Sequence, residues 1–174
     1  MKTCRICKSK FIPTYSSLQV TCSPKCAIEH SKKLKEKNEK IEMRERKERL
    51  LSLKDYVKLC QISFNTFIRE RDKGKQCISC PTILQGKYDA GHFYNCHGHP
   101  SLRFDENNVF GQCVFCNQHK HGNLIEYRKG LIERIGIERF EELESKAKVF
   151  HKFTVDEVKL LTLRYKTKLK EMRK

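Results

Sequence analysis

Hydrophobic residues recur at three- and four-residue steps in several parts of this chain, which is the spacing of one buried face on an α-helix. The first such stripe consists of Leu53, Val57, Cys60, Phe64 and Phe67. It predicts a helix over residues 53–73 that ends before Gly74, with Cys60 as a small core residue. Further stripes over residues 124–135 and 140–147 predict two more helices.

A helix start signal precedes the last stripe. Thr154 and Glu157 have the spacing of a capping box, in which each side chain bonds the backbone of the other residue. Apolar residues then follow at helical steps, namely Val158, Leu161 and Tyr165. Lysine and arginine gather near the C-terminal end of this helix, where cations suit the helix dipole. We therefore expect residues 137–174 to form a basic helical segment.

Residues 27–52 lack this hydrophobic spacing and are dominated by charged side chains without Gly or Pro. Proline is tolerated in a first helical turn, so Ser23-Pro24 can begin a helix here. We interpret the run as a solvated, charged helical linker. A basic helix lying along phosphates and a dimerising helix remain alternatives, although Leu34 and Ile41 alone are too few apolar positions to define a coiled coil.

Eight of the ten cysteines fall into four closely spaced pairs. These pairs are Cys4/Cys7, Cys22/Cys26, Cys77/Cys80 and Cys113/Cys116. Such spacing is typical of tetrahedral zinc sites rather than of disulfides, so we expect two structural Zn²⁺ ions and a reducing, cytoplasmic compartment. Residues 1–26 are too few to bury a core, so zinc must stabilise this N-terminal knuckle. Its role is either docking to nucleic acid or protein, or a structural cap.

Composition limits the remaining possibilities. The chain has 174 residues, of which 38% are hydrophobic, and a formal net charge of +16. That suits one modest core plus an exposed part. The excess positive charge indicates nucleic acid as partner, with an anionic membrane surface as the rarer alternative. No run of about 18 apolar residues predicts a membrane span, and the first residues lack the apolar stretch of a secretory signal. We expect no membrane partner.

The central stretch, residues 77–120, holds the candidate chemistry. A CxxC pair is followed by a strand ending in His92, by a loop containing Asn108, and by a second CxxC pair with Asn117 directly after it. A closed site of four cysteines is structural, so the chemistry lies with the polar residues nearby. Histidine suits the base that deprotonates water in phosphodiester hydrolysis, and a divalent metal commonly stabilises the developing charge.

This order of motifs resembles the zinc-containing branch of the HNH, or ββα-metal, nuclease superfamily. The resemblance implies that His92 is the general base, that Asn108 bridges the loop backbone, and that Asn117 ligates a catalytic Mg²⁺ or Mn²⁺ ion. His121, one helical turn after Asn117, is a candidate second ligand. The resemblance also implies an α+β, mainly helical fold with a ββα-metal core over residues 53–136.

One position departs from that pattern. Many members carry an acidic residue or histidine directly before the base, where this chain has Gly91. The nearest carboxylate is Asp89, which a regular strand would point to the face opposite His92. A bulge near Gly91 could turn Asp89 toward the site. Other residues could instead complete it, and the candidates are His97, His99 and Asp105.

The segment from about residue 52 to residue 139 is similar, more narrowly, to the NinG (Rap) family of lambdoid phage recombination proteins. The similarity rests on two stretches of sequence, DAGHFY and HPSLRFDENNVFGQCVFCNQHKHGNLIEYRKGL. The resemblance implies an endonuclease that cleaves branched DNA such as Holliday junctions and D-loops, in the host cytoplasm. Two symmetric cuts across a four-way junction would suit a homodimer. Phage or host recombination proteins are further candidate partners.

Two hypotheses of other classes compete with a nuclease. One is a non-catalytic, zinc-dependent adaptor that binds nucleic acid through its basic helices. The other is a partner-recruiting protein in which the charged helix forms a dimer. The net positive charge cannot distinguish the adaptor from a nuclease, because both need phosphate contacts. The combination of His92, Asn108 and Asn117 discriminates them, since an adaptor does not need it.

Overall fold

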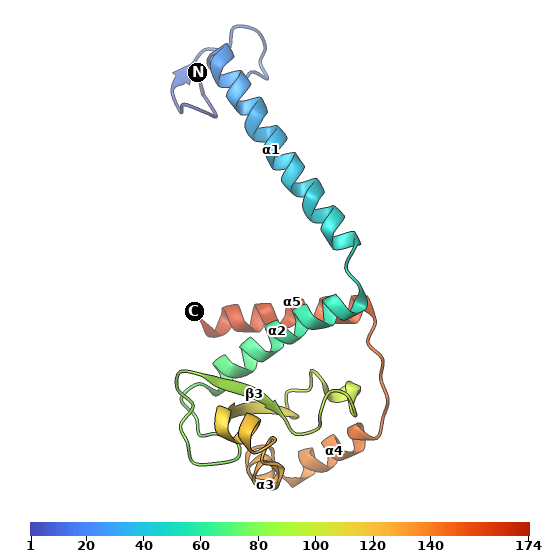
Figure 1. The fold of residues 1–174 in the computed structure, drawn as a ribbon. Coiled ribbons are helices and arrows are strands. Elements are labelled where there is room, and N and C mark those ends of the chain that lie inside the picture. Colours follow the sequence, from blue (N-terminus) through green and yellow to red (C-terminus); the bar gives the residue numbers. More distant parts are fainter. The chain divides into compact units, whose positions relative to one another are not determined.

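A computed structural model describes residues 1–174, which fold as two compact units, Met1–Leu51 and Ser52–Lys174 (Figure 1). The architecture is mainly helical α+β with two small antiparallel sheets, as the sequence predicts. The expected segments 53–136 and 137–174 lie within one unit, because the last helix packs into the core of the first segment. Contacts between residues so far apart in sequence leave no local signal.

The first unit consists of a small cysteine-rich hairpin followed by one long helix. Strands β1 (Lys2–Thr3) and β2 (Lys10–Phe11) pair antiparallel, and helix α1 spans Pro24–Arg49. Ser23 caps α1 by accepting a hydrogen bond from the backbone N–H of Cys26 at 3.3 Å. No residue of α1 is buried within the structure, in agreement with the predicted solvated helix.

Two long helices form one side of the second unit. Helix α2 spans Leu53–Asp72 and helix α5 spans Val155–Met172, and each begins with a capping box, at Ser52 and Thr154 respectively. Their apolar faces meet in a buried cluster made of Cys60, Phe64, Phe67, Ile68, Phe104, Val109, Val158 and Tyr165. Burial of these side chains is the main stabilising contribution to this layer.

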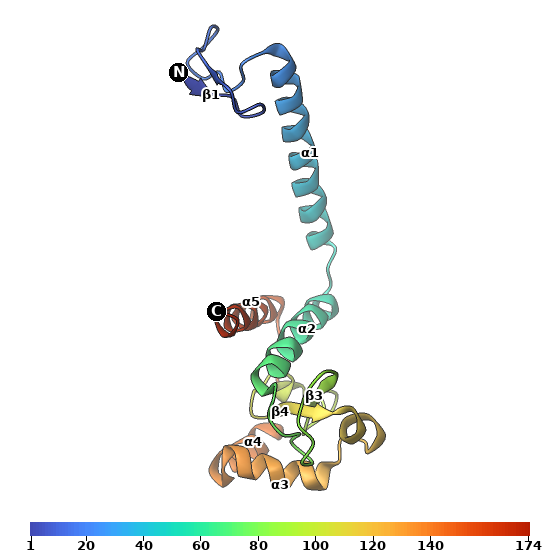
Figure 2. The same cartoon turned by 90° about the vertical axis from the view of Figure 1, so that its left-hand side faces the viewer.

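A two-stranded hairpin forms the middle layer, and two short helices form the opposite side (Figure 2). Strands β3 (Tyr88–His92) and β4 (Val109–Cys113) pair antiparallel with His92 opposite Val109. The loop between them contains the short 3₁₀ helix η1 (Pro100–Leu102). After β4 come the π-helix η2 (Phe115–His119), α3 (Leu124–Ile135) and α4 (Ile137–Ala147).

Successive side chains of the hairpin enter two different cores, because a strand alternates its side chains between faces. Val109 lies in the core against α2 and α5, whereas Phe110 lies in a second core against α3 and α4. The Tyr127 hydroxyl, from α3, accepts a hydrogen bond from the N–H of Phe110 at 3.0 Å and donates one to the carbonyl of Gly91 at 2.7 Å. Helix α3 is thereby fastened to the strand end that carries His92.

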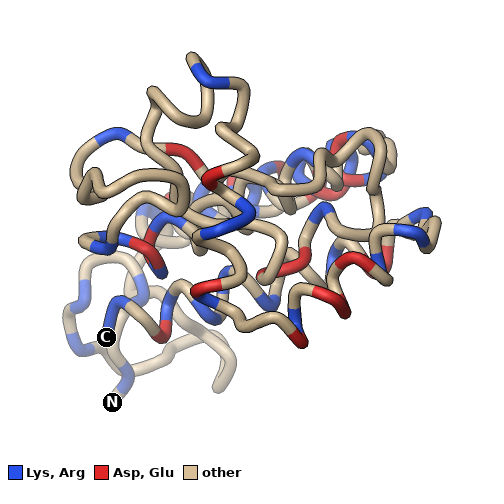
Figure 3. Tube along the Cα trace, turned by 90° about the horizontal axis from the view of Figure 1, so that it is seen from below, with Lys and Arg blue, Asp and Glu red and all other residues tan.

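Basic residues are spread over all parts of the trace rather than confined to one segment (Figure 3). None of the helices is both long enough and apolar enough to cross a membrane.

Candidate metal centre and hairpin site

The four central cysteines converge between the β-hairpin and the turn that follows α2. One ligand atom from each of Cys77, Cys80, Cys113 and Cys116 lies within 4.8 Å of the others. The Sγ atoms of Cys80 and Cys113 are 3.7 Å apart, far longer than the roughly 2.05 Å of a disulfide. Four Zn–S bonds of about 2.3 Å separate tetrahedral sulfurs by nearly this distance. This set of donors therefore fits a structural zinc ion.

Backbone and electrostatics also suit a cation among these thiols. The N–H of Cys113 donates to Cys77 Sγ at 3.3 Å, and the N–H of Cys116 donates to Cys113 Sγ at 3.4 Å. Burial acts to raise the pKa of Cys80, but hydrogen bonds with Thr82 outweigh it and lower that pKa to about 7. Burial raises the pKa of Cys116 to about 12. A bound cation is what allows all four to be thiolates together.

The N-terminal cysteines form a second cluster of the same kind. The ligand atoms of Cys4, Cys7, Cys22 and Cys26 also lie within 4.8 Å of one another. Cys22 Sγ is 3.4 Å from Cys7 Sγ and 3.8 Å from Cys26 Sγ. Both predicted Cys₄ sites thus have the geometry to hold zinc, and all ten cysteines are free of disulfides.

Asp89 and Asn117 meet beside the central cluster. Asp89 Oδ2 accepts hydrogen bonds from Asn117 Nδ2 at 2.9 Å and from Gln118 Nε2 at 2.8 Å. Asn117 lies inside η2, directly after the buried Cys116, so the cysteine cluster fixes its position. A carboxylate and an amide oxygen are the hard ligands that Mg²⁺ and Mn²⁺ prefer. In the structure the Asn117 amide nitrogen, rather than its oxygen, faces the Asp89 carboxylate.

His92 lies on the other face of the hairpin, and the structure does not bring it into contact with Asn117. Its ring packs against Phe64 of α2, with centroids 6.5 Å apart, and Nε2 is 3.1 Å from the carbonyl oxygen of Arg103. A carbonyl only accepts, so Nε2 carries the proton and Nδ1 keeps its lone pair in the neutral ring. Burial lowers the pKa of His92 below its ordinary value of 6.5, which favours that neutral form.

The register of the hairpin is regular at Asp89, so the structure contains no bulge that turns this residue toward His92. Positions 89 and 91 share a face because they are two residues apart. A side chain at 91, directly before His92, would therefore point away from His92 just as Asp89 does. Asp89 lies on that same face and contacts Asn117 from there.

The structure gives a steric reason for a glycine at position 91. A Cβ atom on this residue would lie 2.3 Å from Oε1 of Gln112, the buried side chain across the strand pair. Gln112 donates from Nε2 to the Ser79 hydroxyl at 2.8 Å and to the Gly122 carbonyl at 2.6 Å, which ties it to the segments around the cysteine cluster. The Gln112 amide therefore fills the space that a side chain at residue 91 would need.

Asn108 bridges the loop backbone as predicted. The side chain is fully buried, and its Oδ1 accepts from the N–H of Tyr94 at 2.8 Å. Its Nδ2 donates to the carbonyls of Tyr94 and Leu102, both at 3.0 Å. These three bonds join the chain directly after His92 to the segment whose Arg103 carbonyl orients the imidazole.

His121 does not follow Asn117 on one helical face, contrary to the prediction from sequence. We expected an α-helix to continue through both residues, but η2 is a five-residue π-helix that ends at His119. His121 follows in a left-handed turn with φ +48° and an exposed side chain. The helical spacing that would have put it on the face of Asn117 does not exist.

The other candidate ligands are engaged elsewhere or exposed. His99 Nδ1 is 2.9 Å from the carbonyl oxygen of Ala147, and Asp105 accepts from the N–H of Asn107 at 2.8 Å. His97 is exposed in the loop between the strands. Sequence reasoning missed the contributions of Gln118, Gln112 and Tyr127. Only Tyr127 carried a signal, as an apolar position of a helical stripe.

Comparison with known proteins gives a consistent result. A family model described as Bacteriophage Lambda NinG protein matches residues 1–174. Protein ninG of Salmonella phage P22 is 43% identical over 185 residues, covering 96% of this chain and 90% of that protein. Protein ninG of Escherichia phage lambda is 42% identical with the same coverage. Protein ninG of Escherichia phage 933W is 42% identical over 190 residues, covering 99% and 94%.

No solved structure gives a significant match to the chain. The family resemblance found in the central motif is confirmed, and the match extends over the N-terminal cysteine hairpin and the C-terminal helices as well. The chain belongs to the NinG family of lambdoid bacteriophage proteins.

Proposed function

We propose that this protein is a metal-dependent, structure-specific DNA endonuclease of the HNH type that cleaves branched recombination intermediates. The observation that carries the proposal is the contact between Asp89 and Asn117 beside a Cys₄ cluster. His92 ends the same strand, β3, on its opposite face. Hard oxygen ligands, a closed thiolate scaffold and a neutral imidazole are the parts that metal-assisted phosphodiester hydrolysis requires.

Each residue has a defined task in this proposal. Nδ1 of His92 accepts a proton from water while the Arg103 carbonyl holds the ring in position. Asn108 fixes the loop that provides this carbonyl. Asp89 and Asn117 offer their oxygens to a Mg²⁺ or Mn²⁺ ion, for which the Asn117 amide must turn its oxygen toward the ion. When bound, that ion supplies charge stabilisation at the phosphate and the leaving oxygen.

The net charge of +16 supports DNA as substrate, because phosphate contacts are needed to hold a branched molecule. The preference for four-way junctions and D-loops, and a homodimer making two cuts, are proposed from the family resemblance. So is a role alongside phage or host recombination proteins.

The test is a nicking assay on matched linear and four-way DNA with added Mg²⁺ or Mn²⁺. We expect wild type to cut the four-way substrate, and His92→Ala and Asp89→Ala each to lose at least about 100-fold in cleavage rate. His97→Ala changes an exposed histidine of the loop between β3 and β4; it is the matched control and should cut normally. Unchanged cleavage in His92→Ala would remove this residue from the mechanism.

The pH profile provides a second test. Burial lowers the pKa of His92, so the base loses its bound proton at a pH below 6.5. Cleavage should therefore be nearly constant above pH 6.5 and fall only as the solution becomes more acidic. A profile that rises through pH 8 would show that a group other than His92 is limiting.

One observation favours a non-catalytic nucleic-acid adaptor as the second candidate. The Asp89 carboxylate is already satisfied by two amide donors, as a purely structural carboxylate would be. An adaptor of this kind would bind four-way DNA without cutting it under any divalent metal. Binding without cleavage by the wild-type protein would thus select this alternative.

A further inference from the structure

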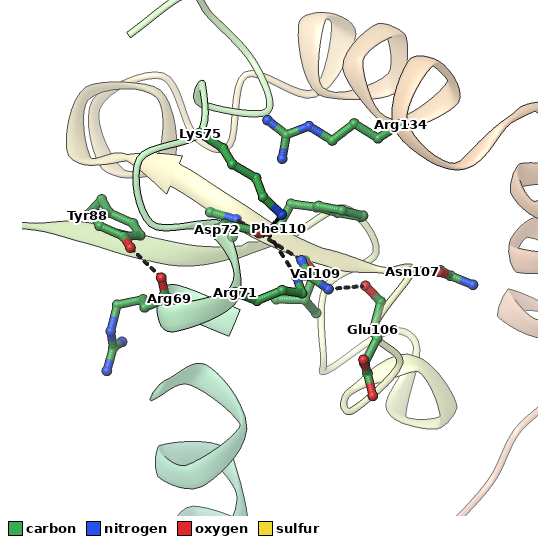
Figure 4. Close-up of polar contacts among 12 residues, drawn as sticks. Arg69, Arg71, Asp72, Lys75, Tyr88, Glu106, Asn107, Val109, Phe110 and Arg134 are labelled. Carbon is green, nitrogen blue, oxygen red and sulfur yellow. Dashed lines mark hydrogen bonds and ion pairs between the residues drawn. The ribbon is translucent and has the colours of Figure 1, made fainter. Parts of the chain in front are cut away.

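A basic groove lies on the side of β4 that faces away from β3. It has a volume of about 450 Å³ and lies where α2, β4 and α3 come together (Figure 4). Its lining residues are Arg71, Asp72, Lys75, Glu106, Asn107, Phe110 and Arg134. None of these residues takes part in the candidate metal centre.

The floor of the groove is rigid. Arg71 donates to the carbonyl of Val109 at 2.8 Å and to that of Glu106 at 3.1 Å, and its guanidinium lies 4.5 Å from the centroid of the Phe110 ring. Its charge is matched by Asp72, a buried carboxylate that also accepts from the N–H of Gly111 at 2.8 Å. Arg71 therefore closes the free edge of β4 and has a structural role.

Two other cations of the groove are not matched in this way. Lys75, with its side chain 55% exposed, is 3.4 Å from the same Asp72 carboxylate that Arg71 already neutralises. Arg134 donates from Nη2 to the carbonyl of Gln76, whereas its Nη1 is buried without any hydrogen-bond acceptor. A buried guanidinium nitrogen without an acceptor is costly, so this group is suited to an anionic ligand.

The remaining acid of the groove is neutralised from outside it. Glu106 forms ion pairs with Lys168 and Arg164 of α5. Five cations thus surround two carboxylates, which leaves three positive charges at this edge. Phe110 is only 7% exposed beneath the guanidinium groups of Arg71 and Arg134, so the groove offers charge and hydrogen bonds rather than a stacking surface for a base.

We propose that Lys75 and Arg134 bind a backbone phosphate of DNA in this groove, as a second contact separate from the phosphate that is cleaved. The separation follows from the hairpin: Arg71 and Asp72 bond the outer edge of β4, while Asp89 lies on β3. A phosphate seated here belongs to a different part of a substrate from the one at the metal centre. The inference rests on the proposed function in taking DNA as the ligand.

The test measures binding, not cleavage. A fluorescent four-way DNA is titrated with the full chain in buffer without added divalent metal, at several salt concentrations. We expect Lys75→Gln/Arg134→Gln to weaken binding about tenfold at moderate salt and to reduce the slope of log K against log salt by about 2. Lys129→Gln, an exposed cation of the same α3 helix, is the matched control and should leave the slope unchanged.

Thermal unfolding and zinc content verify that the variants are folded. If Arg134→Gln unfolds the chain, Lys75→Gln alone still decides, with an expected slope change of about 1. A slope and affinity equal to wild type would overturn the inference and leave an acidic protein partner as the alternative for the groove. Wild type that binds but never cuts DNA would refute the nuclease proposal while leaving this contact intact.

Discussion

The two Cys₄ clusters have the same ligands but different surroundings. In the N-terminal cluster only Cys4 is buried, and none of the three clusters of buried apolar residues lies within Met1–Leu51. In the central cluster Cys77 and Cys116 are buried against Leu84 and Tyr88, within a unit that has two further apolar cores. The same four ligands can therefore provide nearly all of the stability of one folded unit and only one of several stabilising contributions in another.

Removing one thiol from each cluster gives the largest expected effect. Cys26→Ser should unfold residues 1–26 while leaving the thermal unfolding of residues 52–174 unchanged. Cys116→Ser should lower the stability of residues 52–174 by more than about 5 kcal/mol, since a structural metal is lost from a cooperative core. Calorimetry combined with limited proteolysis measures both. Equal effects of the two variants on the main transition would contradict the comparison.

An apolar truncation affects only the unit that has a core. Phe64 is fully buried, and its ring lies 4.8 Å from that of Tyr165 and 5.8 Å from that of Phe104. Phe64→Ala should cost about 3–5 kcal/mol of unfolding free energy, measured by urea titration. Zinc binding by the N-terminal cluster should be unaffected, which colorimetric metal release can verify. Loss of that zinc as well would mean that the two units are coupled.

Breaking a buried polar bridge should have a smaller effect than emptying the core. Asn108→Ala removes three hydrogen bonds and leaves backbone groups of Tyr94 and Leu102 without partners. We expect a loss of about 2–4 kcal/mol in urea unfolding. Asn107→Ala, next to it in sequence and without these bonds, serves as control. A neutral Asn108→Ala would show that water replaces the amide.

Adding a single methyl group at Gly91 should destabilise the protein less than Asn108→Ala does. Its Cβ would clash with Oε1 of Gln112, so Gly91→Ala is expected to lose about 1–3 kcal/mol. Adding Gln112→Ala should recover part of the stability lost to the clash, in a double-mutant cycle followed by thermal unfolding. Strictly additive losses in the two substitutions would show that the side chains do not compete for space.

Substitutions at two closely matched helix caps should have the smallest effects on stability. Thr154 and Ser23 each accept a backbone hydrogen bond at a helix start, at 3.3 Å in both cases. Thr154→Ala should lower the main transition by about 1 kcal/mol. Ser23→Ala should reduce only the helicity of α1, seen by circular dichroism. A shift of the main transition by Ser23→Ala would argue against independent units.

Local patterns predicted the parts of this molecule whose causes are local. The cysteine spacings, the apolar stripe ending at Phe67 and the capping box at Thr154 each depend on residues within one or two turns, and the structure has them where expected. The position of His121 was misjudged because an α-helical period was assumed where a π-helix ends.

Contacts between residues far apart in the chain could not be predicted from local sequence patterns. The Gly91–Gln112 contact depends on the register of the hairpin, which pairs Gly91 with Phe110 and so places Gln112 diagonally across from Gly91 on the same face. The groove is assembled from residues as far apart as Arg71 and Arg134. Hydrophobic spacing marks which side of an element is buried but does not specify which remote side chain meets it.

The Gly91–Gln112 contact has an evolutionary consequence. A lineage that placed a larger side chain at residue 91 would first have to shorten residue 112, since the two groups would occupy the same volume. A chain with a larger side chain at residue 91 alone would carry the clash, so we expect residues 91 and 112 to change together among homologous phages.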